Sequence, residues 1–198
     1  MILSGRRVVL GVSGGIASYK ACTIARRLTE AGAAVDVVLT AAAGEFIRPI
    51  TFEALTGRPV LTSLWDRGKA LSHIEYAKNP DAIVVAPATA NLIARAAQGV
   101  ADDLLTAILL AATQPVAIAP AMNDDMFAHP STQQNLQRLV DRGWELLGPS
   151  RGPLAEGPSE RPGRMLEPDE IVVHVVRLLR QATSRWNALR VVVTAGPT

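Results

Sequence analysis

Three side chains in the sequence could react with or bind a ligand, and the segments around them favour such a role. His73 carries an imidazole, which titrates near neutral pH and can act as a general base, although a lone histidine is more often structural. Asn123 follows an apolar run, where its amide can donate to a carboxylate without adding charge or can cap a helix. Glu156 lies in a Gly- and Pro-rich segment, 148–165, of a kind that often forms a lid, although a solvated loop acid is the ordinary interpretation.

A glycine turn near the N-terminus predicts an anion site. Residues 11–15 read GVSGG and stand between an apolar run and a predicted helix. Glycines let the backbone approach a phosphate, the N–H groups of the helix start bind it, and the Ser13 hydroxyl can add a donor. The segment is neither a Walker loop nor GxGxxG, because no Gly-Lys-Ser/Thr follows and Ser13 occupies the position of the second glycine. With no arginine nearby we expect a mononucleotide phosphate, and a plain tight turn is the alternative.

Two apolar runs, beginning at Ala82 and Val116, each end in Ala-Pro-Ala and are followed by Asn91 and Asn123. We expect each proline to end its strand, because it lacks a backbone donor. Parallel strands would place both turns at the carboxyl edge of one sheet, where open α/β folds bind ligands. Two ordinary strand-to-helix turns are the alternative interpretation.

Two adjacent carboxylates, Asp102 and Asp103, stand at the start of a predicted helix. Acidic side chains are favourable there because they complement the positive end of the helix dipole. An Asp in this position can also accept a hydrogen bond from a heterocyclic N–H, so a capping role and a ligand-binding role are both open.

The elements that must position these residues alternate along the chain. Apolar runs predict strands at 7–12, 35–39, 82–85, 116–119 and 144–147, and amphipathic patterns predict helices at 16–31, 46–55, 91–98, 102–112, 130–142 and 167–182. Alternation of this kind predicts a mostly parallel sheet covered by helices on both faces. We therefore expect a three-layer α/β/α, Rossmann-like (flavodoxin-like), doubly wound fold.

Composition limits the class of protein. The chain has 198 residues, of which 48% are hydrophobic and 19% charged, so a globular fold is expected. No apolar run approaches the roughly 20 residues of a membrane span, and no signal peptide is evident, so we expect a cytoplasmic protein without a membrane partner. Cys22 is the only cysteine, which excludes an intrachain disulfide and argues against a metal site built on cysteines. A net charge of +2 without basic runs argues against nucleic-acid binding.

The last residues suggest a second domain. Residues 190–198 read as a strand that runs into a glycine turn, like the first strand of a new α/β unit. We therefore expect one domain at 1–182, a linker at 183–189, and the first strand of a truncated domain at 190–198.

Taken together, the motifs resemble those of the flavin-dependent cysteine decarboxylases. The similarity is to the decarboxylase half of bifunctional phosphopantothenoylcysteine decarboxylase/phosphopantothenate–cysteine ligases and covers essentially the whole chain. The matching pieces are GVSGGIA (11–17), SHIE (72–75), APATAN (86–91), GVADDLL (99–105), PAMNDDM (120–126) and GRM (163–165).

The resemblance implies an FMN cofactor between the subunits of a homotrimer, often assembled into a dodecamer. It implies His73, contributed across the subunit interface, as the base, Asn123 as the ligand of the substrate carboxylate, and Met126 and Arg164 as further substrate contacts. The FMN contacts that it implies are Ser13, Gly14, Gly15, Thr40, Phe46, Ala88, Thr89, Asn91, Asp102, Asp103, Leu104, Leu105 and Met122.

The activity that the resemblance implies is decarboxylation of 4'-phosphopantothenoylcysteine to 4'-phosphopantetheine in coenzyme A biosynthesis. The cysteine thiol is oxidised to a thioaldehyde, CO2 leaves an enethiolate, and re-reduction gives the product, with a lid cysteine supplying a proton. A ligase domain would follow in the full-length protein.

The chain departs from the family pattern at the lid, which usually reads Leu-Ala-Cys-Gly but has Glu156 in place of the cysteine. Two outcomes are open. Glu156 serves as the proton donor if a closed lid keeps its carboxyl protonated. Otherwise the last protonation is slow or uses water, and the enethiol is released. Two alternatives to this function are a peptide-cysteine decarboxylase that stops at the enethiol, with which Glu156 is compatible, and a non-catalytic flavoprotein or regulatory homologue, which loss of the lid cysteine favours.

Overall fold

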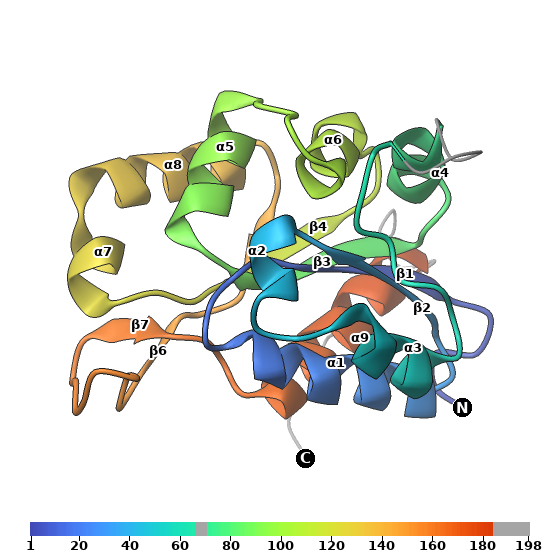
Figure 1. The fold of residues 1–198 in the computed structure, drawn as a ribbon, viewed down its shortest axis with the longest axis horizontal. Helices are drawn as coiled ribbons and strands as arrows, with labels where there is room; N and C mark the ends of the chain where they lie inside the picture. The colour runs from blue at the N-terminus through green and yellow to red at the C-terminus, as the bar shows by residue number, and fades with distance from the viewer. Residues whose placement is uncertain (66–70, 184–198) are drawn as a thin grey trace, which may run out of the picture.

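The computed structural model describes residues 1–65 and 71–183 (Figure 1). The expected strand at 190–198, and the expected linker beyond its first residue, lie outside the described residues. None of the helices in the described ranges is long and apolar enough to cross a membrane.

A five-stranded parallel sheet forms the centre of the fold, and its strand order is β2-β1-β3-β4-β5. This order confirms the predicted flavodoxin-like, doubly wound class, because the winding reverses between β1 and β3. The strands are β1 (Arg7–Val12), β2 (Ala34–Leu39), β3 (Ala82–Ala88), β4 (Val116–Pro120) and β5 (Glu145–Leu146).

Helices cover both faces of the sheet, as predicted, and Figure 1 shows the two layers on opposite sides of the strands. One layer holds α1 (Ser18–Glu30), α3 (Pro49–Thr56) and α9 (Pro168–Thr183). The other holds α4 (Ser72–Lys78), α5 (Ala90–Gln98), α6 (Leu104–Ala111) and α8 (Pro130–Asp141). Two short helices, α2 (Ala41–Gly44) and α7 (Asp124–Ala128), follow the ends of β2 and β4.

The central strands are buried on both sides because successive side chains point to opposite faces. In β1, Val8 and Leu10 pack in the core beneath α1 and α9, whereas Val9 packs in the core beneath α5 and α6. This two-sided burial explains why the strands read as continuous apolar runs in the sequence.

The expectation that each proline ends its strand is wrong for β3. The strand passes through Pro87 and continues to Ala88, which pairs with Pro120 of β4. The ladder shifts register between Val85 and Ala88, so the missing N–H of Pro87 interrupts no regular pairing. The Pro87 carbonyl instead accepts a hydrogen bond from the backbone N–H of Ser13, at 3.2 Å.

Four features have no counterpart in the predicted pattern. These are α2, α4, α7 and an antiparallel hairpin made of β6 (Ser150–Arg151) and β7 (Pro162–Arg164). All are short, so each carries too little hydrophobic patterning to be recognised in the sequence. The predicted strand at 144–147 is also shorter, because only Glu145 and Leu146 pair with β4.

A buried carboxylate fixes the edge of the sheet. Asp36 of β2 is 2% exposed and forms ion pairs with Arg7 at 2.5 Å and Arg58 at 2.7 Å. Arg7 lies over the ring of Tyr76 in α4, 5.0 Å from its centroid. Burial alone would lower the pKa of Arg7, but the hydrogen bond and charge of Asp36 outweigh burial and raise it. The Asp36 cluster therefore joins α4 to the sheet.

We expect Asp36→Asn to lower the free energy of unfolding by about 2 kcal/mol, because Arg7 and Arg58 both lose a charged partner in a buried setting. Urea denaturation followed by circular dichroism measures the change. Glu30→Gln, which removes an exposed helical ion pair with Arg26, is the matched control and should cost much less. Equal losses in the two variants would contradict a special role for Asp36.

Candidate functional site

A cavity of about 950 Å³ opens at the carboxyl ends of the central strands. Its wall contains the turn after each of β1 to β4 and the tip of the β6–β7 hairpin. These segments are Ser13–Ala17, Thr40–Ala42, Thr89–Asn91, Ala121–Asn123 and Pro153–Glu156. The two turns predicted at the carboxyl edge, those after β3 and β4, therefore both line this cavity.

The glycine turn after β1 packs directly against the start of α2. A Cβ atom added to Gly14 would lie 2.5 Å from the carbonyl carbon and the Cβ of Ala42. Only glycine permits this approach without a backbone shift. A Cβ at Gly15 would meet nothing closer than Thr89 Cγ2 at 3.5 Å, an ordinary contact. The two glycines thus differ: Gly14 is required by packing, whereas Gly15 leaves bare backbone at the cavity.

The Ser13 hydroxyl links two turns of the cavity wall. It donates to the Pro87 carbonyl at 2.8 Å and accepts from the Thr89 backbone N–H at 2.9 Å, and Ser13 is 2% exposed. Its proton is therefore engaged within the protein. The backbone N–H of Ser13 also donates to the Pro87 carbonyl, at 3.2 Å, and the contact between Ser13 and an FMN phosphate stays a prediction.

Short polar side chains begin the helices around the cavity. Thr40 accepts from the Ala43 N–H at 3.2 Å, and Thr89 accepts from the Leu92 N–H at 3.4 Å. Such N-caps satisfy backbone donors that have no partner inside the helix. Residues expected to contact a cofactor therefore also hold the helix starts in place.

An arginine and two carboxylates form one wall. Arg95 donates to Asp102 at 2.6 Å and to Asp103 at 2.8 Å, and Asp103 also caps α6 through the N–H of Thr106. Burial would lower the pKa of Arg95, but the hydrogen bonds and charges of the two carboxylates outweigh it and raise the pKa. The Arg95 Nε atom is buried and has no hydrogen-bond partner among the residues that the structure describes. Within the described residues, no group of three or more His, Cys, Asp or Glu side chains is arranged to hold a metal.

Asn123 has the capping role, one of the two roles that the sequence left open, and its role as a ligand of a substrate carboxylate stays a prediction. Its Oδ1 caps α7 by accepting from the N–H groups of Asp125 at 2.8 Å and Met126 at 3.3 Å. Its Nδ2 donates to the Glu156 carboxylate, and both side chains line the cavity. The structure therefore brings together two of the three predicted catalytic residues. Met126, a predicted substrate contact, lines the same cavity.

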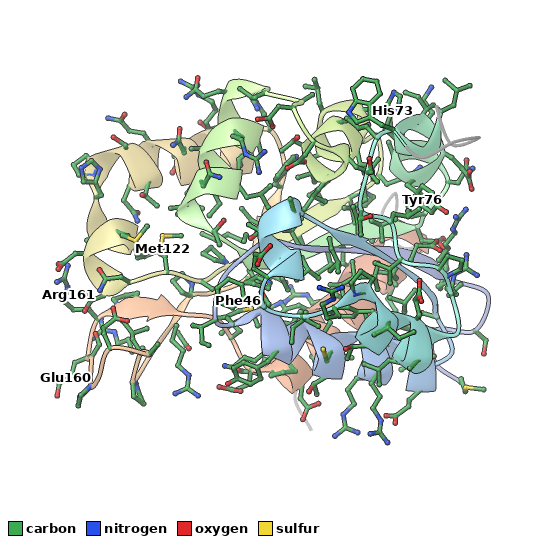
Figure 2. The ribbon with its side chains drawn as sticks, viewed as in Figure 1. Phe46, His73, Tyr76, Met122, Glu160 and Arg161 are labelled. Atoms are coloured by element: carbon green, nitrogen blue, oxygen red, sulfur yellow. The ribbon has the colours of Figure 1, made fainter. Side chains whose placement is uncertain are left out.

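The loop between β6 and β7 is fastened to α7 by successive contacts. Beyond the Asn123–Glu156 contact, Asp124 accepts from Ser159 at 2.6 Å and Asp125 pairs with Arg161 at 2.6 Å. The Ser159 hydrogen bond lowers the pKa of Asp124 below its usual range. Figure 2 shows Glu160 and Arg161 at the same end of the molecule as Met122. Residues 153–156 of this loop line the cavity, and its role as a lid stays a prediction.

His73, the third predicted catalytic residue, is not at this cavity. It lies on α4, well apart from Met122 in Figure 2, and its Nδ1 is buried without a hydrogen-bond partner among the described residues. Its role as a base therefore stays a prediction that requires a second subunit.

Four predicted FMN contacts also lie away from the cavity lining. Ala88, Leu104 and Leu105 have side chains buried in the hydrophobic core, and Phe46 is 49% exposed outside the cavity. Leu105 packs close to Gly11, where an added Cβ would lie 2.6 Å from it. Contacts of these four residues with a flavin stay predictions.

Lys20 is a cavity residue that the motifs do not indicate. It is only 7% exposed, lines the cavity, and donates to Glu167 at 2.9 Å and to the Met165 carbonyl at 3.4 Å. It shares the buried face of α1 with Ala21 and Ile24. A lysine at an apolar helical position was the available signal.

Comparison with known proteins identifies relatives. The family model described as Flavoprotein matches residues 2–180. The coenzyme A biosynthesis bifunctional protein CoaBC of Vibrio cholerae is 50% identical over 198 residues, which are 99% of this chain and 49% of that protein. The chain thus spans about half the length of this relative.

Two solved structures have the same fold at more than 30% identity. One is SpaF, described as an FMN-dependent cysteine decarboxylase, with 31% identity, a TM-score of 0.78, and coverage of 92% of this chain and 99% of that one. The other is a cysteine-to-serine mutant of PPC decarboxylase in complex with pantothenoylaminoethenethiol, with 32% identity, a TM-score of 0.77, and coverage of 89% and 98%. The family predicted from the motifs is confirmed.

We expect Gly14→Ala to lower the free energy of unfolding by about 1–3 kcal/mol, because the new methyl group collides with the backbone of Ala42. Gly15→Ala is the matched control, and its methyl group meets only an ordinary contact with Thr89. Thermal and urea denaturation of both variants measure the difference. Similar stability of the two variants would show that α2 moves freely away from the glycine turn.

Proposed function

The chain belongs to the Flavoprotein family, and we propose that it is an FMN-dependent decarboxylase that converts 4'-phosphopantothenoylcysteine to 4'-phosphopantetheine in coenzyme A biosynthesis. The names of the CoaBC and PPC decarboxylase relatives support this substrate. The observation in the fold that supports it best is the meeting of Asn123 and Glu156 at a large cavity on the carboxyl edge of the sheet. In the full-length protein, a ligase domain and a cytoplasmic location are part of the same proposal.

The residues around the cavity fit FMN. The cavity lies at the point where the strand order reverses, and Gly15 leaves backbone bare beside it. The Arg95 Nε atom in its wall has no hydrogen-bond partner within residues 1–65 and 71–183. Gly14 and Gly15, in the turn that Ser13 shapes, and Thr40 would hold the phosphate. Thr89, Asn91, Asp102, Asp103 and Met122 would lie near the ring system. When bound, FMN would take up the two electrons lost by the cysteine thiol and return them after decarboxylation.

Asn123 is suited to bind the carboxylate that leaves. Its amide nitrogen carries two N–H groups, one of which donates to Glu156, so one remains for the substrate. A neutral donor orients a carboxylate without adding the strong attraction of a full positive charge. Because the carboxylate loses its charge on becoming CO2, a cation in this place would stabilise the substrate more than the transition state.

Glu156 is suited to return a proton. Departure of CO2 leaves an enethiolate, which needs a proton on carbon before the saturated thiol can form. The family uses a lid cysteine for this step, and Glu156 stands in the corresponding place beside Asn123. The contacts of Asp124 with Ser159 and of Asp125 with Arg161 hold the loop that carries it. We therefore assign Glu156 as the acid.

His73 would act across a subunit interface. Within one chain α4 lies apart from the cavity, so a homotrimer in which α4 of one subunit faces the cavity of the next would complete the site. Two observations support such an interface: the buried Nδ1 of His73 has no partner in the described part of the chain, and Leu71 beside it is 73% exposed. There His73 would take the proton of the substrate thiol. Further assembly to a dodecamer belongs to the same proposal.

We expect the FMN-loaded protein to convert 4'-phosphopantothenoylcysteine to the saturated thiol, and Glu156→Gln to release the enethiol instead, because an amide cannot supply the proton. Mass spectrometry of the products separates the two, which differ by two hydrogens. Glu156→Cys, which restores the family residue, should again yield the saturated thiol. An unchanged product from Glu156→Gln would remove Glu156 as the acid. Release of the enethiol by the unmodified protein would favour the alternative function, a peptide-cysteine decarboxylase that stops at the enethiol.

We expect His73→Gln and Asn123→Ala each to lower kcat by about 100-fold or more, and their co-expression to restore activity. In a mixed trimer, about one third of the sites combine an intact His73 from one subunit with an intact Asn123 from the next. Steady-state rates of the co-expressed and singly expressed proteins measure the effect. Absence of complementation, despite formation of mixed oligomers, would place both residues in sites made by one chain.

A further inference from the structure

We propose that Lys20 and Arg164 form a phosphate-monoester subsite in the cavity and that it takes the phosphate group of the substrate. This inference rests on the proposed function and extends it, because it names the residues that would distinguish a phosphorylated substrate from an unphosphorylated one. The two side chains come from α1 and β7, and both line the cavity.

Two cations share one carboxylate at this place. Lys20 Nζ lies 2.9 Å and Arg164 Nη2 lies 2.7 Å from the same atom, Oε1 of Glu167. The hydrogen bond from Lys20, and then that from Arg164, lowers the pKa of Glu167, so this carboxyl stays ionised at neutral pH. Two positive charges and one negative charge leave a net charge of +1. Lys20 is 7% exposed, so little water surrounds its ammonium group. Because water weakens electrostatic interactions, this buried positive charge attracts a nearby anion more strongly than an exposed one would.

The other charged groups of the cavity wall do not favour an anion. Arg95 is paired with Asp102 and Asp103, which leaves that wall with a net charge of −1. Among the described residues, the remaining acidic or basic lining residue is Glu156, which carries no positive charge whether protonated or ionised. Arg161, which pairs with Asp125, and Arg151 are not part of the lining. The cavity therefore has one basic end, and a phosphate dianion would be attracted to it.

Both cations retain donors for a phosphate. A guanidinium carries five N–H groups in a planar fork that fits two phosphate oxygens, and Arg164 uses one side-chain nitrogen for Glu167. The Lys20 ammonium carries three N–H groups, and its contacts are Glu167 and the more distant Met165 carbonyl at 3.4 Å. The Glu167 contact fixes both side chains, so little ordering is needed when an anion binds.

The FMN phosphate has the same chemistry and is the competing occupant. The proposed function places it at the glycine turn after β1 and at Thr40, which leaves the Lys20–Arg164 subsite for the substrate. The two sources are separable, because FMN differs from riboflavin and phosphopantothenoylcysteine differs from pantothenoylcysteine by one phosphate each.

The experiment compares Lys20→Met and Arg164→Gln with Arg151→Gln, a matched control on β6, the strand that pairs with β7. We expect each of the first two variants to lower kcat/KM for phosphopantothenoylcysteine by about 10- to 100-fold, with little change for pantothenoylcysteine. Glu167→Gln removes the competing negative charge and should raise the preference for the phosphorylated substrate. Affinities for FMN and riboflavin, measured by quenching of flavin fluorescence, should keep their ratio in all variants.

Three outcomes would overturn the proposal. An equal loss for both substrates would mean that Lys20 and Arg164 only support the fold. A loss of FMN affinity relative to riboflavin would assign the subsite to the cofactor. A fall in substrate preference in Glu167→Gln as large as that in Lys20→Met would contradict the charge argument. Should Lys20→Met fail to fold, Arg164→Gln decides alone, because its side chain is 34% exposed. An unmodified protein inactive on both substrates would instead refute the proposed function.

Discussion

The hydrogen bonds of the Ser13 hydroxyl hold the two turns on which the cavity depends. The turns after β1 and β3 flank the point where the strand order reverses, and no regular strand pairing continues into them. Ser13 joins them by donating to Pro87 and accepting from Thr89, which in turn starts α5. Because this hydroxyl is buried, water does not compete for either bond. A serine at this position therefore shapes the cavity even if it never touches a ligand.

The sheet and its flanking helices were predictable because burial on two faces and on one face leave different patterns in a sequence. Strands β1, β3 and β4 are continuous apolar runs, and α1 carries a regular buried stripe. The short elements were not predictable, because α4 and α7 are held by partners distant in sequence. In α4, Glu75 and Tyr76 meet Arg7, almost 70 residues away. The prediction that Pro87 ends its strand is wrong because the ladder shifts register there, so no regular pairing requires an N–H group at this position.

Some features of the cavity could likewise be predicted from the sequence, and others could not. The turns after the strands were located by the rule that ligands bind at the carboxyl edge, which needs only strand positions. The contact between Asn123 and Glu156 joins residues 33 positions apart and follows from the way the hairpin lies against α7. Lys20 gave only a weak signal, a charge on an apolar helical face. Its partner Glu167 lies 147 residues away in the sequence, so no local sequence pattern predicts this ion pair.

The separation of charge in the cavity bears on the chemistry as much as on recognition. A substrate with a phosphate at one end and a carboxylate at the other could bind in either direction if the wall were uniformly basic. Here the net positive charge lies at Lys20 and Arg164, whereas Asn123 offers a neutral amide beside the carboxyl group of Glu156. The dianion gains more from the cations than the carboxylate does. The phosphate thus sets the orientation of the substrate in the cavity. The substrate carboxylate then lies beside a neutral amide, so no strong ion pair is lost when it becomes CO2.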